Sequence, residues 1–264
     1  MAPIAISVIT LTRLRAERLF RAIRTVAAQT GVRVLEHLVL IDDCARTHGE
    51  LAAAAWLPTH LRWSVHSRSA DDRTGPTRVA TLRNLGVRHA AGTHVAFLDD
   101  DNEWAPDHLA TLVACMERSG CPAVHSHLTI HWPDGRPYLE PRLPWARDAR
   151  TAAEKYDALV RAGVWTRGSN IVRDRVDPEG CRDPIRTVDM GAWLFTRALL
   201  DELPFRTDYG NGDWTAVTTE DDKLLDDLVR RRIPTACTSR PTLKYVVGGY
   251  SNHWLEGDDA WRLT

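Results

Sequence analysis

Two clusters of aspartates each follow an apolar, strand-like run of the chain, at Asp42-Asp43 and at Asp99-Asp100-Asp101. Carboxylate oxygens are hard ligands that suit Mg²⁺ or Mn²⁺, and phosphate oxygens commonly complete such a shell. Three adjacent carboxylates repel one another at neutral pH, so they need a shared cation or contact with solvent. The clusters therefore predict a site for a divalent cation and phosphate. The alternative is a solvated acidic turn ahead of a helix.

A further acidic group stands in the stretch Thr219-Glu220-Asp221-Asp222-Lys223. The leucine spacing behind it predicts a helix over 220–232, with Thr218 or Thr219 as its cap. The partial positive charge of a helix N-terminus favours the ionised form of first-turn acids. These carboxylates are thus either reactive groups held ready as bases or ordinary surface acids that complement the helix dipole.

Alternating strand and helix patterns have to position the aspartate clusters. Strands are predicted over 4–10, 34–41, 61–66 and 93–98, and helices over 16–29, 50–56, 77–91 and 106–118. This alternation predicts an α/β protein with a Rossmann-like, mostly parallel sheet flanked by helices. Ligands of such sheets bind outside the carboxyl ends of the strands, so both aspartate clusters are expected at one crevice.

The second part of the chain is less regular, rich in Pro, Gly, Arg and Trp between residues 127 and 191. We expect a soft boundary near residue 126, which divides one continuous domain into a first half, 1–126, and a second half, 127–264. Most of the ten tryptophans fall in the second half. Such enrichment suits a cleft for a sugar or aromatic ligand as well as a small core.

Composition excludes several classes of protein. The net charge of −1 lacks the basic field expected of a nucleic-acid binder. No run of 18 apolar residues is present, so no integral membrane segment is expected, and the first residues lack the basic region of a signal peptide. Five cysteines without a CxxC pair are typical of free thiols in a reducing compartment. We therefore expect a cytoplasmic protein, with a homodimer left open.

Several separated motifs, in their order and spacing, resemble the nucleotide-binding half of family 2 inverting glycosyltransferases of GT-A fold, including the spore-coat-polysaccharide type. The resemblance covers about residues 5–118 and resumes at 189–195 and 219–231. The motifs are Ser7-Val8-Ile9, Ile41-Asp42-Asp43, Arg83-Asn84-Leu85-Gly86, Ala91-Gly92 and Phe97-Leu98-Asp99-Asp100-Asp101-Asn102 with Trp104 and Pro106.

The resemblance implies how a UDP- or dTDP-sugar donor would bind. Asp43 matches the acid that accepts a hydrogen bond from the pyrimidine ring, and Asp100 the acid that meets the ribose hydroxyls. Asp101, with Asp99, matches the ligands of a Mg²⁺ or Mn²⁺ ion that bridges the two phosphates.

Further donor contacts are implied outside the aspartate clusters. Arg73 and Arg78 match basic residues that contact the donor, or are plain surface arginines. The loop after the first strand departs from the family, because Thr12 and Arg13 stand where an aromatic residue commonly stacks on the base. The planar guanidinium of Arg13 could stack instead.

For the acceptor side, the resemblance makes Asp221 the catalytic base of a direct, inverting displacement, with Glu220 and Asp222 as rivals. Gly191 and Ala192 match a segment that leaves space for a ligand.

Two aromatic groups complete the expected site. Trp193 could stack on a sugar or aromatic acceptor, or pack in the core. His253 could join the metal shell, or be a structural histidine.

The sequence thus predicts a metal-dependent glycosyltransferase that acts on a small or carrier-bound acceptor, such as a tailoring step on a secondary metabolite. One alternative is a sugar-1-phosphate nucleotidyltransferase, although residues 11–15 lack the Gly-rich phosphate loop of that class. The other alternative is a nucleotide-sugar-binding relative that has lost catalysis.

Overall fold

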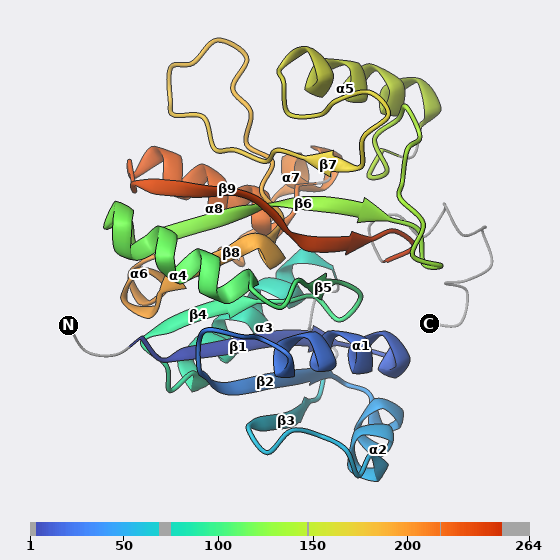
Figure 1. Cartoon of the computed structure of the whole chain (residues 1–264), viewed down its shortest axis with the longest axis vertical. Helices are drawn as coiled ribbons and strands as arrows, with labels where there is room; N and C mark the ends of the chain where they lie inside the picture. The colour runs from blue at the N-terminus through green and yellow to red at the C-terminus, as the bar shows by residue number, and fades with distance from the viewer. Residues whose placement is uncertain (1–3, 69–74, 147, 217, 250–264) are drawn as a thin grey trace.

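The computed structural model describes residues 4–68, 75–146, 148–216 and 218–249. These residues form a nine-stranded mixed sheet with helices on both faces (Figure 1). The strands are β1 (Ile6–Thr12), β2 (Val34–Asp42), β3 (Leu61–His66), β4 (His94–Phe97), β5 (Glu103–Trp104), β6 (Ala123–His131), β7 (Ile171–Val172), β8 (Trp193–Thr196) and β9 (Thr235–Val246). The helices are α1 (Ala16–Ala27), α2 (Ala45–Ala53), α3 (Pro76–His89), α4 (His108–Ser119), α5 (Ala149–Arg161), the 3₁₀ turn η1 (Met190–Ala192), α6 (Arg197–Glu202), α7 (Asn211–Ala216) and α8 (Glu220–Arg230).

The strand order is β3-β2-β1-β4-β8-β6-β9-β5, with β7 paired to β6. Strands β3, β2, β1 and β4 run parallel, and β6 runs parallel to β9. Strand β8 lies antiparallel between β4 and β6 and joins the two parallel groups. The prediction of an α/β protein with a mostly parallel sheet and flanking helices is confirmed. Besides β8, the short strands β5 and β7 pair antiparallel, with β9 and β6 respectively.

The centre of the sheet is built from strands that are apolar on both faces. Ile6, Val8 and Ile9 of β1 are 0–1% exposed, as expected for a strand covered by helices on each side. In Figure 1 helices α1 and α4 lie in front of this sheet and α3 behind it. Helix α1 presents Leu19 and Ile23 to the core at helical spacing.

Helix α2 differs from its prediction, since it runs over Ala45–Ala53 and not over 50–56. The Cys44 thiol caps it by accepting a hydrogen bond from the Thr47 backbone N–H, 3.4 Å away. A thiol is an unusual cap, so the usual Ser, Thr, Asp or Asn signal of a helix start is missing.

The expected boundary at residue 126 falls inside β6, which pairs with both β8 and β9. The two halves of the chain therefore share one sheet. None of the helices in the described part of the chain combines the length and apolarity that crossing a bilayer requires. A cytoplasmic location and a homodimer stay predictions.

Candidate active site

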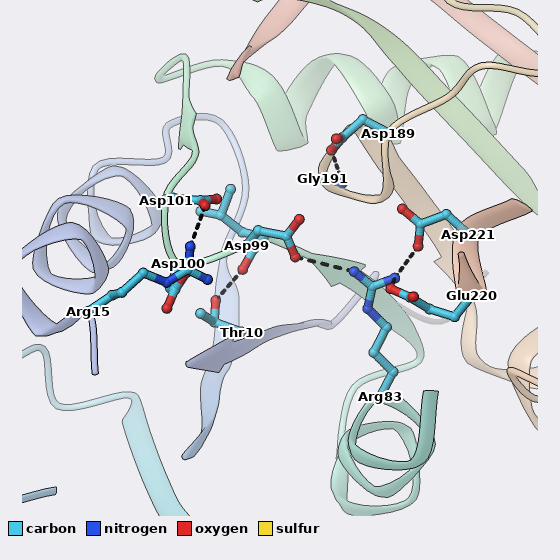
Figure 2. A network of polar contacts seen from close by, with 11 residues as sticks. Thr10, Arg15, Arg83, Asp99, Asp100, Asp101, Asp189, Gly191, Glu220 and Asp221 are labelled. Carbon is cyan, nitrogen blue, oxygen red and sulfur yellow. Dashed lines mark hydrogen bonds and ion pairs between the residues drawn. The ribbon is translucent and has the colours of Figure 1, made fainter. Parts of the chain in front are cut away.

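The acidic turn Asp99–Asp101 follows β4 at the carboxyl edge of the parallel strands. Its start is fixed by the Thr10 hydroxyl, which donates a hydrogen bond to the Leu98 carbonyl at 2.7 Å (Figure 2). The Asp100 side chain is fully buried, the Asp101 side chain is 12% exposed, and the Asp99 side chain is 38% exposed. The three carboxylates therefore differ in their access to a ligand, with Asp99 the most open.

Arg15, directly before α1, pairs with two of these acids. Its Nη2 lies 2.8 Å from Asp100 Oδ1 and its Nη1 lies 2.7 Å from Asp101 Oδ2. Arg15 stands at the N-cap of α1 without capping it. Burial would lower the pKa of this guanidinium, but Asp100 and Asp101 raise it well above its usual value. Arg15 therefore stays charged at the acidic turn.

Arg83 of α3 joins the acidic turn to the start of α8. Its guanidinium lies 3.2 Å from Asp99 Oδ1 and 2.9 Å from Glu220 Oε1, and it also contacts Asp221 Oδ1 (Figure 2). The Arg83 side chain is only 4% exposed and packs beside the rings of Phe97 and Phe205. Acids 122 positions apart in the sequence thus meet on one buried cation.

The start of α8 is fixed by a capping box. The Thr219 hydroxyl accepts from the Asp222 backbone N–H, and the Asp222 carboxylate accepts from the Thr219 backbone N–H at 2.8 Å. Asp222 is therefore committed to the cap. Glu220 and Asp221 both contact Arg83, and Asp221, at 24% exposed against 10% for Glu220, is the more open of the two.

Negative charge is concentrated between the acidic turn and α8. Burial raises the pKa of Asp100 to about 7, with Asp101 as a further cause, although Arg15 opposes the shift. Burial likewise raises the pKa of Glu220 to about 8, against the effect of Arg83. For Asp189 burial, then repulsion from Asp99 and Asp221, raises the pKa well above its ordinary value.

These hard carboxyl oxygens suit a divalent cation by ligand type, and a bound cation would relieve the repulsion among them. Among the residues that the structure describes, no group of three or more His, Cys, Asp or Glu side chains is arranged to hold a metal ion.

The second aspartate cluster lies at the same edge, after β2. Asp42 accepts hydrogen bonds from Arg68 Nε at 3.0 Å and from Arg78 Nε at 2.9 Å. Burial alone would raise the pKa of Asp42, but these two arginines lower it. Asp43 is exposed and has a left-handed backbone, with φ of 47°, so its side chain points away from the core and is open to a ligand.

Other predicted donor contacts are placed as follows. Arg78 is 8% exposed and is no plain surface arginine, because it also donates to the His66 carbonyl at 2.7 Å. Thr12 ends β1, is 3% exposed and lies beside Asp100, where its hydroxyl helps to lower the pKa of that acid. Arg13 is half-buried in the loop after β1. Arg73 and His253 lie outside the described residues.

Of the two predicted alternatives for Trp193, the structure shows core packing and not stacking on an acceptor. The indole is 1% exposed, stacks on Phe195 at 5.2 Å between ring centroids and tilts against His125 at 4.8 Å. Trp193 faces inward because β8 is a central strand of the sheet.

The space expected at Gly191 and Ala192 is filled by protein. Ala192 is fully buried, and a Cβ on Gly191 would lie 3.1 Å from Asp189 Oδ1 and 3.2 Å from Leu243. Gly191 also donates its N–H to Asp189 Oδ1 at 2.8 Å (Figure 2). This glycine is needed to seat Asp189 against the core.

The sequence predictions gave no site role to three residues that the structure places in the site: Arg15, Arg83 and Asp189. Arg83 had a usable signal, because it stands in the apolar stripe of its helix with Ala80 and Val87, and a buried arginine needs anionic partners. Arg15 had a weaker signal, since arginine at an N-cap position does not serve the helix.

Comparisons with known proteins agree with this geometry. The family described as Glycosyl transferase family 2 matches residues 7–161 of the chain. The succinoglycan biosynthesis protein ExoO of Rhizobium meliloti (strain 1021) is 30% identical over 121 residues, which are 46% of this chain and 32% of that protein. The chain thus spans about a third of the length of this curated relative.

Solved structures share the fold at low identity. TarS of S. aureus has a TM-score of 0.57 at 14% identity, over 92% of this chain and 61% of that chain. The mannosyltransferase PcManGT of Pyrobaculum calidifontis, in complex with GDP-Man and Mn²⁺, has a TM-score of 0.57 at 17% identity, over 97% of this chain and 60% of that chain. The chain therefore has the fold of these GT-A glycosyltransferases over nearly its whole length.

Proposed function

Because the chain belongs to glycosyl transferase family 2, we propose that it transfers a sugar from a UDP- or dTDP-sugar to an O–H or N–H group of an acceptor, with inversion at the anomeric carbon. Family membership sets the nucleotidyltransferase alternative aside. TarS, which has been solved with UDP and with UDP-GlcNAc, supports a uridine donor as the first candidate.

The observation that carries the proposal is the meeting of Asp99 and Asp221 on Arg83. Asp99 stands on the donor side, after β4, and Asp221 stands on the first turn of α8. Direct displacement requires a leaving-group site and a base within reach of the same carbon atom. The contacts of Arg83 with Asp99 and Asp221 support such an arrangement, because they hold one carboxylate from each of the two elements close together.

For the donor, we propose that Asp43 accepts the ring N–H of the pyrimidine, since its carboxylate is exposed and projects from the carboxyl edge. The Asp42 carboxylate is occupied by its hydrogen bonds from Arg68 and Arg78. These contacts stabilise the edge of the sheet at which we propose that the base binds. Asp99 and Asp101 would hold a Mg²⁺ or Mn²⁺ ion together with the diphosphate. Such an ion, when bound, stabilises negative charge on the departing nucleoside diphosphate.

For the acceptor, we propose Asp221 as the base. Arg83 contacts its Oδ1, which leaves Oδ2 for the acceptor proton. The Asp221 side chain is 24% exposed, so an acceptor group can reach it. Glu220, whose pKa is about 8, is mostly protonated at neutral pH and is the weaker candidate. We propose a small or carrier-bound acceptor, as in the tailoring of a secondary metabolite.

Donor binding and turnover are tested separately. Nucleotide sugars, with GDP-mannose as a contrast, are screened by thermal shift with and without Mn²⁺, because a bound donor raises the melting temperature by mass action. Acceptor candidates are then screened for a mass increase of one sugar. If none of the nucleotide diphosphates raises the melting temperature, the proposed donor class is refuted. If sugar is transferred to polysaccharides alone, the proposal of a small acceptor is refuted.

The base is tested with Asp221→Asn, and Asp226→Asn serves as the matched control on the same helix, where Asp226 is 58% exposed. Asp221→Asn is expected to lower transfer by about 10²–10⁴-fold while the donor affinity is kept. The control is expected to transfer normally. Full activity of Asp221→Asn would refute the assignment, and a wild-type protein that binds donor without any turnover would indicate a non-catalytic relative.

A further inference from the structure

Arg15 is placed where it can control access to the acidic turn. It comes from the loop between β1 and α1, and its two terminal nitrogens contact Asp100 at 2.8 Å and Asp101 at 2.7 Å. The Arg15 side chain is 34% exposed, whereas the two acids are 0% and 12% exposed. The guanidinium thus covers the acids from the solvent side and is the member of the group with room to move.

Charge balance makes this contact important. In the part of the chain that the structure describes, the ion pairs formed by Asp99, Asp100 and Asp101 come from Arg15 and Arg83. Arg83 is buried and divides its charge among Asp99, Glu220 and Asp221. Arg15 is therefore the cation that compensates Asp101.

The chain after β9 covers the Arg15–Asp101 pair. A Cβ on Gly249 would lie 2.3 Å from Asp101 Oδ2 and 3.8 Å from Arg15 Nη1. The backbone of Gly249 thus lies directly against Asp101 Oδ2, the oxygen that Arg15 contacts. This oxygen is enclosed by a guanidinium on one side and by backbone on another.

A divalent cation and a guanidinium repel each other at neighbouring positions, and both seek the same lone pairs of a carboxylate. We propose that Arg15 is the resident counter-cation of Asp101 in the donor-free protein, and that it has to release this carboxylate before a divalent cation can bind there. The inference rests on the proposed function, because that function places both the divalent cation and the donor diphosphate at the acidic turn.

The released guanidinium does not remain without a partner. It stays at the acidic turn, where the donor diphosphate is placed by the proposed function, and arginine matches phosphate oxygens through two parallel hydrogen bonds. The diphosphate therefore takes over from Asp101 as the partner of Arg15. Donor and cation should then bind with positive coupling, and this coupling should depend on Arg15.

The test measures Mn²⁺ binding to the full chain without nucleotide, from the EPR signal of free Mn²⁺. Arg15→Gln is expected to bind Mn²⁺ about tenfold more tightly than the wild type, because the competitor for Asp101 is gone. In the double variant with Asp101→Asn this gain should disappear. Unchanged Mn²⁺ affinity in Arg15→Gln would overturn the proposal.

Controls separate this effect from net charge and from misfolding. Arg150→Gln removes the same charge from a side chain that is 87% exposed on α5 and should leave Mn²⁺ affinity unchanged. Arg15→Lys keeps the charge but loses the two-point contact with Asp100 and Asp101, so its gain in Mn²⁺ affinity should be smaller than that of Arg15→Gln. If Arg15→Gln does not fold, an unchanged affinity in Arg15→Lys overturns the proposal.

A second titration adds UDP. UDP should increase Mn²⁺ affinity more in the wild type than in Arg15→Gln, since only the wild type gives the diphosphate a guanidinium. Equal enhancement in both would overturn the transfer of Arg15 to the diphosphate. Failure of the proposed function is a separate result. It would be shown by a wild type that binds no nucleotide sugar, and it does not depend on the Mn²⁺ affinity of Arg15→Gln without nucleotide.

Discussion

Replacing Arg83 by methionine removes a buried guanidinium and keeps most of the aliphatic stem. The change leaves Glu220, Asp221 and Asp99 without their shared cation, although they remain close to one another. Removing one partner of a buried ion pair costs about 3–5 kcal/mol of folding stability, because the other charge stays buried and uncompensated.

The expected value lies at the lower end of that range. Asp99 is 38% exposed and Asp221 is 24% exposed, so water can reach both, whereas Glu220 is 10% exposed and can become protonated. The contacts to Phe97 and Phe205 lie near the outer limit for cation–π attraction and add little. We therefore expect Arg83→Met to lower the free energy of unfolding by about 3 kcal/mol.

The measurement is urea unfolding of Arg83→Met and the wild type at neutral pH. The midpoint should fall while the slope of the transition stays the same, since the folded surface is unchanged. Arg230→Met, which removes a 55% exposed arginine paired with Asp227 on α8, is the matched control and should cost about 0–1 kcal/mol. A loss for Arg83→Met within the range of this control would refute the buried bridge.

Three further predictions concern other parts of the chain. Asp43→Asn should weaken binding of the uridine nucleotide about tenfold with an unchanged melting temperature, because the residue is exposed and asparagine tolerates its φ of 47°; an unchanged affinity would remove Asp43 from the donor site. Gly249→Ala should destabilise the protein, because its Cβ would meet Asp101 at 2.3 Å, whereas Gly49→Ala on α2, with nothing within 4 Å, should stabilise it by about 0.5–1 kcal/mol; equal melting temperatures would contradict both. Burial lowers the pKa of His108 to about 3. As the pH falls below about 6.5, this histidine therefore takes up a proton in the unfolded chain but not in the folded protein. Its contribution should lower the free energy of unfolding by up to about 1.4 kcal/mol per pH unit. His108→Asn should show a shallower loss between pH 6.5 and 5 in urea titrations, and an identical pH dependence would show that the buried imidazole is not responsible.

The parallel strands β1 to β4 and the start of α8 could be predicted because their signals are local. Strand β3 has the predicted bounds, Leu61–His66. Helix α8 begins after Thr219, as the cap and the acidic first turn indicate. The family resemblance was confirmed for the same reason, because its motifs lie at strand ends, where short stretches of sequence carry the pattern.

The parts that could not be predicted depend on contacts between distant segments. Nothing near Arg83 in the sequence shows that Glu220 and Asp221 will be its partners, and nothing near Arg15 shows Asp101. Apolar aromatic residues such as Trp193 suit a ligand pocket and a core equally well until the strand order is known. The orientation of β8 between β4 and β6 decided that case.

The position of Arg83 in the first half of the chain limits how this protein can be recombined with its relatives. A chimera that joins residues 1–126 of one relative to the second half of another would have its junction within β6. It would also combine Arg83 of one parent with the α8 acids of the other. A hybrid made to change the acceptor would have to keep an arginine at position 83 that can pair with the acids of the incoming α8. The junction between the two parents would have to lie outside β6. Engineered hybrids of this fold should therefore be matched at the contact between Arg83 and α8 before any loop is varied.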